Sequence, residues 1–271
     1  MPLLWLRIAV ILYGLGLAYA LLVLAGRARS LANVIVHLMG LGMTFHLVSL
    51  VEATIIFGRF LPANVHHSES LMAFMLMAVF MIVYALYDTT SPGIFIFPLV
   101  FLLTFSSAIG QEPPQFNNPL LRSGWIITHV VLIFIGYAAL AFSFAASLLY
   151  LWQERTLKAK RNLGLLSRLP ALEVIDEIGY RLLLIGFPFM TLGLIAGSVV
   201  AQAKFGATYF TDPKIVLSLM MWLVYVVLLY TRWSSGWRGR RAAMLASIAF
   251  VVAMGAWAAN VFSQVHRFVQ R

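Results

Sequence analysis

Long apolar runs separated by short polar breaks are the feature that most constrains this chain. A helix needs about 20 mostly apolar residues to cross the hydrocarbon core of a bilayer. Pro, Gly, Asn and charged residues divide the sequence into eight such runs, at 3–25, 31–57, 70–88, 93–109, 125–152, 180–202, 214–232 and 242–265. We therefore expect an all-α, polytopic integral membrane protein with about eight transmembrane helices, forming a single domain over residues 1–271.

The composition agrees with a membrane protein. Of the 271 residues, 62% are hydrophobic and 10% are charged, whereas soluble domains have about half and about a quarter. The absence of cysteine excludes disulfides and thiolate metal sites. A net charge of +10 would suggest a nucleic-acid partner for a soluble protein. In a membrane chain it indicates a bias of basic residues between the two sides, so we expect no nucleic-acid partner.

This bias predicts the orientation of the chain. Basic residues accumulate in cytoplasmic loops, and 11 of the 19 follow the first, fifth and seventh runs: Arg27, Arg29, Arg155, Lys158, Lys160, Arg161, Arg168, Arg232, Arg238, Arg240 and Arg241. We expect these loops in the cytoplasm and both termini outside, in the periplasm or its equivalent. The longest of them, 153–179, is a cytoplasmic connector, either an amphipathic helix on the membrane surface or a solvated segment.

Two histidines and an aromatic loop share the predicted outer side. His129 lies four residues into the fifth run, about 6 Å below the surface at 1.5 Å per residue, and His266 follows the eighth run. The outer loop 203–213 carries Phe205, Tyr209, Phe210 and Asp212-Pro213. Imidazole is a good axial ligand for haem iron, and aromatic rings can cover a porphyrin. From the residues alone, two alternatives stay open: a haem site, or histidines that hydrogen-bond locally.

A further histidine lies deep in the second run. Ionisable groups inside a membrane are costly, so His46, with Glu52 on the same run, is a functional candidate. It could act as a ligand, in a proton relay or in an interhelical hydrogen bond. His66 and His67 adjoin Glu69 in an outer loop, and we expect them to be solvated.

The second half of the chain carries a series of short motifs. They are Trp125-Ile-Ile-Thr-His129, Gly136-Tyr137-Ala138, Asp212-Pro213, Trp222-Leu223-Val224-Tyr225, the basic turn Gly236-Trp237-Arg238-Gly239-Arg240-Arg241, and Asn260 followed by His266. In these motifs the chain resembles the cytochrome c assembly family, the haem-handling membrane proteins of the CcsA and CcmC type. The tryptophans of that family's outer loop are replaced here by Phe205, Tyr209 and Thr211. The pattern is closest to the HemX-like and YpjD-like branch, which shares the stretch from His46 to Glu52.

The resemblance implies a haem-binding protein of cytochrome c biogenesis in the bacterial cytoplasmic (inner) membrane. Haem, b-type and non-covalent, would be held at the outer face with His129 and His266 as axial ligands. The other cofactor contacts would be His46, Phe205, Tyr209, Phe210, Asp212 and Trp222, and Lys204 and Lys214 could pair with the propionates. The partner would be an assembly protein or apocytochrome c, and the chain alone would not be an enzyme. The HemX-like resemblance leaves an alternative: a non-catalytic membrane regulator or assembly partner in haem metabolism, acting through 153–179 and 232–241.

Overall fold

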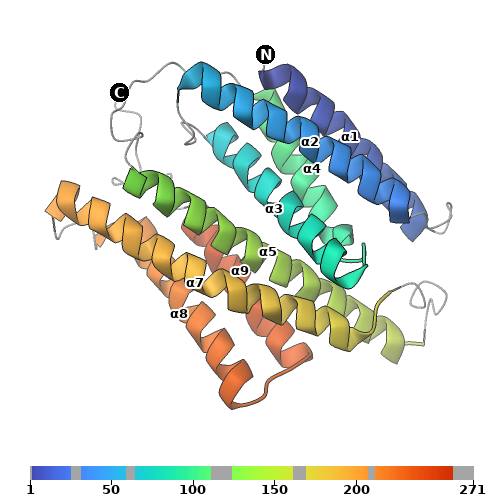
Figure 1. The fold of residues 1–271 in the computed structure, drawn as a ribbon. Helices are drawn as coiled ribbons and strands as arrows, with labels where there is room; N and C mark the ends of the chain where they lie inside the picture. The colour runs from blue at the N-terminus through green and yellow to red at the C-terminus, as the bar shows by residue number, and fades with distance from the viewer. Residues whose placement is uncertain are drawn as a thin grey trace. The chain divides into compact units, whose positions relative to one another are not determined.

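A computed structural model describes residues 2–25, 32–58, 65–110, 124–160, 169–206 and 211–258, and all regular structure in these ranges is helical (Figure 1). The helices are α1 (Pro2–Leu24), α2 (Ala32–Phe57), α3 (Val65–Tyr87), α4 (Gly93–Ile109), α5 (Gly124–Lys158), α7 (Leu172–Phe205), α8 (Pro213–Ser234) and α9 (Arg240–Ala258). The eight expected helices are thus present in the described residues, and the all-α prediction is confirmed.

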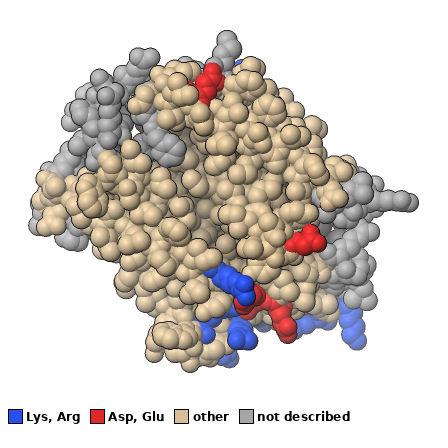
Figure 2. Space-filling view, in the orientation of Figure 1, with Lys and Arg blue, Asp and Glu red and all other residues tan. Residues whose placement is uncertain are grey.

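Six of these helices, α1, α2, α3, α5, α7 and α8, are long and apolar enough to cross a membrane. α4 is apolar but has 17 residues, and α9 has 19 residues and begins with two arginines. The face drawn in Figure 2 consists mostly of uncharged residues, as a surface in contact with lipid requires. The chain is therefore a multi-pass membrane protein, and the orientation of its termini stays a prediction.

The clearest difference from the expected boundaries is at α7. This helix begins at Leu172, eight residues before the expected start at 180, so the end of the predicted connector forms its first turns. Ile175 and Ile178 are fully buried there. Their apolar face packs inside the protein, which explains why the helix continues beyond the apolar run.

The helices form two compact units, and α1 to α4 belong to the first, Met1–Leu121 with Arg155–Pro170. In it, α1 packs on α2 and α4, and α3 packs on α4. Trp5 stacks on Phe45 with ring centroids 5.8 Å apart, and Phe80 meets Phe97 edge-on at 4.7 Å. Aromatic pairs therefore join consecutive helices in this unit.

The second unit, Arg122–Glu154 with Ala171–Arg271, contains α7, α8, α9 and most of α5. Its core includes Leu140, Met190, Met221 and Tyr225, which are almost or completely buried. Four glycines of α7 form a seam against α5: Gly179, Gly186, Gly193 and Gly197. Because glycine has no side chain, the two backbones approach closely along this seam. The seam positions the candidate site described next.

Candidate functional site

The His129 imidazole, on the second turn of α5, is held by α7. Its Nδ1 lies 2.6 Å from the carbonyl oxygen of Gly193. A carbonyl only accepts, so Nδ1 carries the proton and Nε2 has a free lone pair. Among the described residues, no hydrogen bond reaches Nε2. The ring also packs against Gly197, where a Cβ atom would lie 2.5 Å from Nδ1. His129 thus has a fixed ring and a nitrogen available to a metal.

The start of α8 lies at the same end of the second unit. Asp212, which is 6% exposed, is the N-cap of α8 and accepts a hydrogen bond of 3.0 Å from the backbone N–H of Lys214. Pro213 occupies the first turn, where its missing N–H costs nothing. Lys214 is close enough to His129 to act on it electrostatically. The Asp-Pro motif therefore begins the helix that brings a cation towards the imidazole.

Among the described residues, His129 fits one axial position of a haem. His266, Tyr209 and Phe210 lie outside the described residues, and so do the side chains of Lys204 and Phe205 at the end of α7. The second ligand and the aromatic cover therefore stay predictions.

Trp222 lies inside the second unit, away from the start of α8. It is nine residues beyond Pro213, about 14 Å along the helix at 1.5 Å per residue. Its indole Nε1 donates a hydrogen bond of 3.0 Å to Thr191 Oγ1, and its ring stacks on Phe187. In this structure Trp222 joins α8 to α7. Its contact with haem stays a prediction.

His46 is completely buried in the first unit. Its Nε2 lies 2.8 Å from Ser70 Oγ on α3, and its Nδ1 lies 3.5 Å from the hydroxyl of Tyr13 on α1. Phe74 meets the ring edge-on. Of the three alternatives for His46, this arrangement favours the interhelical hydrogen bond, because both ring nitrogens already face partners.

Comparison with known proteins now identifies the family. Residues 34–256 match the family described as Cytochrome C assembly protein. The chain belongs to this family. It is 30% identical to the cytochrome c biogenesis protein CcsA of Guillardia theta over 275 residues, which cover 91% of this chain and 86% of that protein. CcsA of Pyropia yezoensis is 28% identical, with 91% and 88% covered.

Other alignments of this cytochrome c assembly protein are shorter. CcsA of Chlamydomonas reinhardtii is 32% identical over 151 residues, which cover 55% of this chain and 41% of that protein. In such alignments the chain spans about half the length of the curated relatives it matches. These relatives carry the CcsA name. That this chain belongs to the HemX-like branch and lies in the bacterial inner membrane stays a prediction.

His66, in the first turn of α3, is 43% exposed in its side chain, which agrees with partial solvation, and it also contacts a neighbouring carboxylate. His66 Nδ1 lies 3.2 Å from Glu69 Oε2, and Ser106 Oγ of α4 donates a hydrogen bond of 2.8 Å to the same oxygen. The Glu69 side chain is 13% exposed. These residues therefore connect α3 to α4, a contact that spacing along one helix could not reveal.

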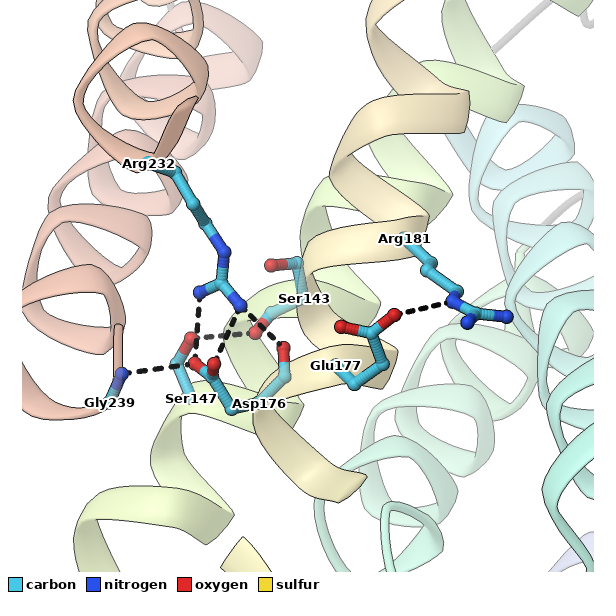
Figure 3. Close-up of polar contacts among 7 residues, drawn as sticks. All are labelled: Ser143, Ser147, Asp176, Glu177, Arg181, Arg232 and Gly239. Atoms are coloured by element: carbon cyan, nitrogen blue, oxygen red, sulfur yellow. Dashed lines mark hydrogen bonds and ion pairs between the residues drawn. The ribbon is translucent and has the colours of Figure 1, made fainter. Parts of the chain in front are cut away.

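Sequence reasoning missed a polar cluster in the second unit of this assembly protein (Figure 3). The Arg232 guanidinium at the end of α8 donates hydrogen bonds of 2.9 and 2.6 Å to the two carboxylate oxygens of Asp176 on α7. The N–H of Gly239 also reaches Asp176, at 3.2 Å, and the Tyr180 ring lies 4.4 Å below the guanidinium. The regulator alternative would place Asp176, within 153–179, on a cytoplasmic partner surface. Instead it is engaged within the protein and its side chain is 15% exposed.

A small cavity adjoins this cluster. It is lined by Ser143, Ser147, Tyr150 and the ion pair, among others. Its volume of about 20 Å³ has room for one water molecule. Elsewhere in the described ranges, no group of three or more His, Asp or Glu side chains could hold a metal ion.

Proposed function

We propose that this chain is a haem-binding membrane protein of cytochrome c biogenesis, which holds haem at the outer membrane face with His129 as an axial ligand. The observation that carries the proposal is the hydrogen bond from His129 Nδ1 to Gly193, which leaves Nε2 available. The relatives support the same process, because their name is cytochrome c biogenesis protein CcsA.

Each residue of the proposed haem site would have a separate role. The Gly193 carbonyl keeps the proton on Nδ1 and increases the basicity of Nε2. Lys214 would pair with a propionate, and Asp212 holds the start of α8 that carries this lysine. Haem would supply an iron with axial positions for imidazole. His266 would be the second ligand, and Phe205, Tyr209 and Phe210 would cover the ring.

The partner and location follow from the same proposal. An apocytochrome c, or an assembly protein that presents it, would receive the haem, and the membrane would be the bacterial inner membrane. The regulator alternative would act through 153–179 and 232–241, and a partner of the first segment would contact acidic residues such as Glu173, Asp176 and Glu177. It is weaker, because Asp176 is paired with Arg232 inside the protein.

An absorption spectrum of the purified protein, oxidised and reduced, tests the proposal. The wild type should show a Soret band at a stoichiometric level, and His129→Ala should abolish it. His37→Ala is the matched control, because the His37 Nδ1 also contacts a backbone carbonyl, that of Asn33. It should leave the spectrum unchanged. A wild type without stoichiometric haem, or a His129→Ala protein with an unaltered spectrum, would contradict the proposal.

A further inference from the structure

The α8–α9 turn, residues Trp233 to Arg241, combines exposed indole and guanidinium groups at the end of a membrane-spanning helix. Trp233 is 85% exposed, more than any other large hydrophobic residue that the structure describes. It lies in the last turn of α8, which is apolar and long enough to span a membrane. An indole in this position suits the membrane interface, where tryptophan is enriched.

Three arginines of the turn carry charge that the protein does not neutralise. Arg238, Arg240 and Arg241 are exposed, and in the described part of the chain none of them forms an ion pair with a carboxylate. Asp176 contacts the turn, but it is paired with Arg232. Arg241 lies over the Trp237 ring, 5.8 Å from its centroid. The turn therefore presents three positive charges.

The position of these charges opposes helix stability. Arg240 and Arg241 open α9, and basic residues are unfavourable at the positive end of a helix dipole. Backbone N–H groups nevertheless connect the turn to the rest of the unit: that of Gly239 donates to Asp176 Oδ1, and that of Trp237 donates to the Thr231 carbonyl. Gly236 and Gly239 have φ angles of 62° and 61°, and a Cβ atom on Gly239 would lie 2.5 Å from the Tyr150 hydroxyl. The arginines therefore lie where they disfavour the helix, which indicates that they serve a purpose other than the stability of the fold.

Arginine is the commoner basic residue of this chain, at 15 of 19 positions. Lysine and arginine serve the positive-inside rule equally, and the segment 155–161 uses both. All four basic residues of 232–241 are arginine. Arginine differs from lysine in binding phosphate with two parallel hydrogen bonds.

We propose that the α8–α9 turn binds the phosphate headgroup of an anionic phospholipid, with Arg238, Arg240 and Arg241 on the phosphate and Trp233 at the level of the headgroups. Basic clusters beside membrane spans attract anionic lipids, and the three exposed arginines lie within four residues of one another. This proposal is independent of haem.

Native mass spectrometry of the detergent-purified protein tests the proposal. The protein is titrated with phosphatidylglycerol and with phosphatidylcholine of identical acyl chains. The wild type should bind phosphatidylglycerol at least about tenfold more tightly, given three basic groups at the surface. Excess inorganic phosphate should not displace the lipid. Equal affinity for the two lipids, or displacement by phosphate, would overturn the proposal.

Substitutions test whether the α8–α9 turn causes the preference for phosphatidylglycerol. The triple substitution Arg238→Gln, Arg240→Gln, Arg241→Gln should reduce the preference to within about twofold. The matched control Arg155→Gln, Lys158→Gln, Lys160→Gln removes the same charge at and just beyond the end of α5 and should retain the preference. If both variants lose it equally, the turn is not the site. If the arginine variant fails to fold, the triple Arg→Lys protein should show a weaker preference than the wild type, and an unchanged preference would contradict phosphate binding by arginine.

Discussion

At the scale of single residues, two glycines of α7 position the imidazole of His129. The Gly193 carbonyl holds Nδ1, and the absence of a side chain at Gly197 leaves room for the ring. Both contacts come from residues more than 60 positions away in sequence. The orientation of the ring therefore depends on how closely α5 and α7 approach.

The substitution Gly197→Ala should displace the imidazole. The new Cβ atom would lie 2.5 Å from Nδ1 and 2.6 Å from Cε1, so the ring must move and Nε2 with it. We expect the haem content per protein to fall at least about tenfold, equivalent to about 1.4 kcal/mol of binding free energy. Gly255→Ala is the control, since a Cβ there meets nothing within 4 Å. Equal haem content in both purified variants would contradict this role of Gly197.

The sequence singled out His46 and His129 but not the groups that contact them. The cost of charge in a membrane singled out His46, yet Ser70 and Tyr13, which face its ring nitrogens, lie on other helices. For His129, the place near the start of a long apolar helix was predictable from the apolar run. The Gly193 hydrogen bond was not, because a backbone carbonyl has no signature in sequence.

At the scale of helices, the glycine seam of α7 determines how closely α5 can pack. Gly179, Gly186 and Gly193 recur every seven residues, so they lie on one face of the helix. A Cβ atom at Gly186 would lie 2.5 Å from Ala139 Cβ and 2.6 Å from the Tyr225 hydroxyl, but at Gly179 its nearest atom would be Ala146 Cβ at 3.5 Å. The contact between α5 and α7 is therefore tight at Gly186 and looser at Gly179.

Alanine at these two positions should therefore have effects of opposite sign. Gly186→Ala overpacks the seam, and we expect it to lower the free energy of unfolding by about 1–3 kcal/mol. Gly179→Ala fits, and by restricting the unfolded chain it should raise the free energy of unfolding by up to about 1 kcal/mol. Denaturant unfolding of both proteins in the same detergent measures the difference. Destabilisation of the same size in both would show that the seam is not a close contact.

Periodicity and run length predicted the helices well, because each apolar run must satisfy its backbone hydrogen bonds internally. The early start of α7 was harder to predict. Residues 172–179 mix Glu173, Asp176 and Glu177 with apolar side chains, which is equally typical of a surface helix. Two features that depend on the rest of the protein make this segment part of the packed unit: the burial of Ile175 and Ile178, and the pair of Asp176 with an arginine 56 residues away. The seven-residue spacing of Gly179, Gly186 and Gly193 is the signal in the sequence that could have predicted the seam.

The ion pair of Asp176 and Arg232 provides a stability test at the same scale, since it joins α7, α8 and the start of α9. Asp176→Asn would leave the guanidinium, whose side chain is 8% exposed, without its counter-charge. We expect a loss of about 3 kcal/mol in the free energy of unfolding. Glu177→Gln is the matched control, because its pair with Arg181 is 43% and 62% exposed and should contribute less than about 1 kcal/mol. Similar losses in the two proteins would refute a structural role for the Asp176 pair.

At the scale of the whole molecule, the topology depends on whether α4 crosses the membrane. Its 17 residues extend about 26 Å at 1.5 Å per residue, slightly less than the hydrocarbon core of about 30 Å. However, Ser106 near the end of α4 bonds Glu69 near the start of α3, and Gly110 packs against His66. α4 thus returns along nearly the full length of α3, a helix long enough to span. We infer that α4 crosses as well.

Single cysteines can test this topology without background, because the chain has no cysteine. If α3 and α4 both cross, Val65→Cys and Gly124→Cys lie on one side and Ser235→Cys on the other. All three positions are exposed. By the positive-inside rule, the first two should react with a membrane-impermeant maleimide in sealed spheroplasts, and Ser235→Cys only after lysis. Labelling of Val65→Cys and Gly124→Cys from opposite sides would mean that α4 turns back within the bilayer. Reversal of the whole pattern would place both termini in the cytoplasm, and the arginines of the α8–α9 turn would then face the outer leaflet.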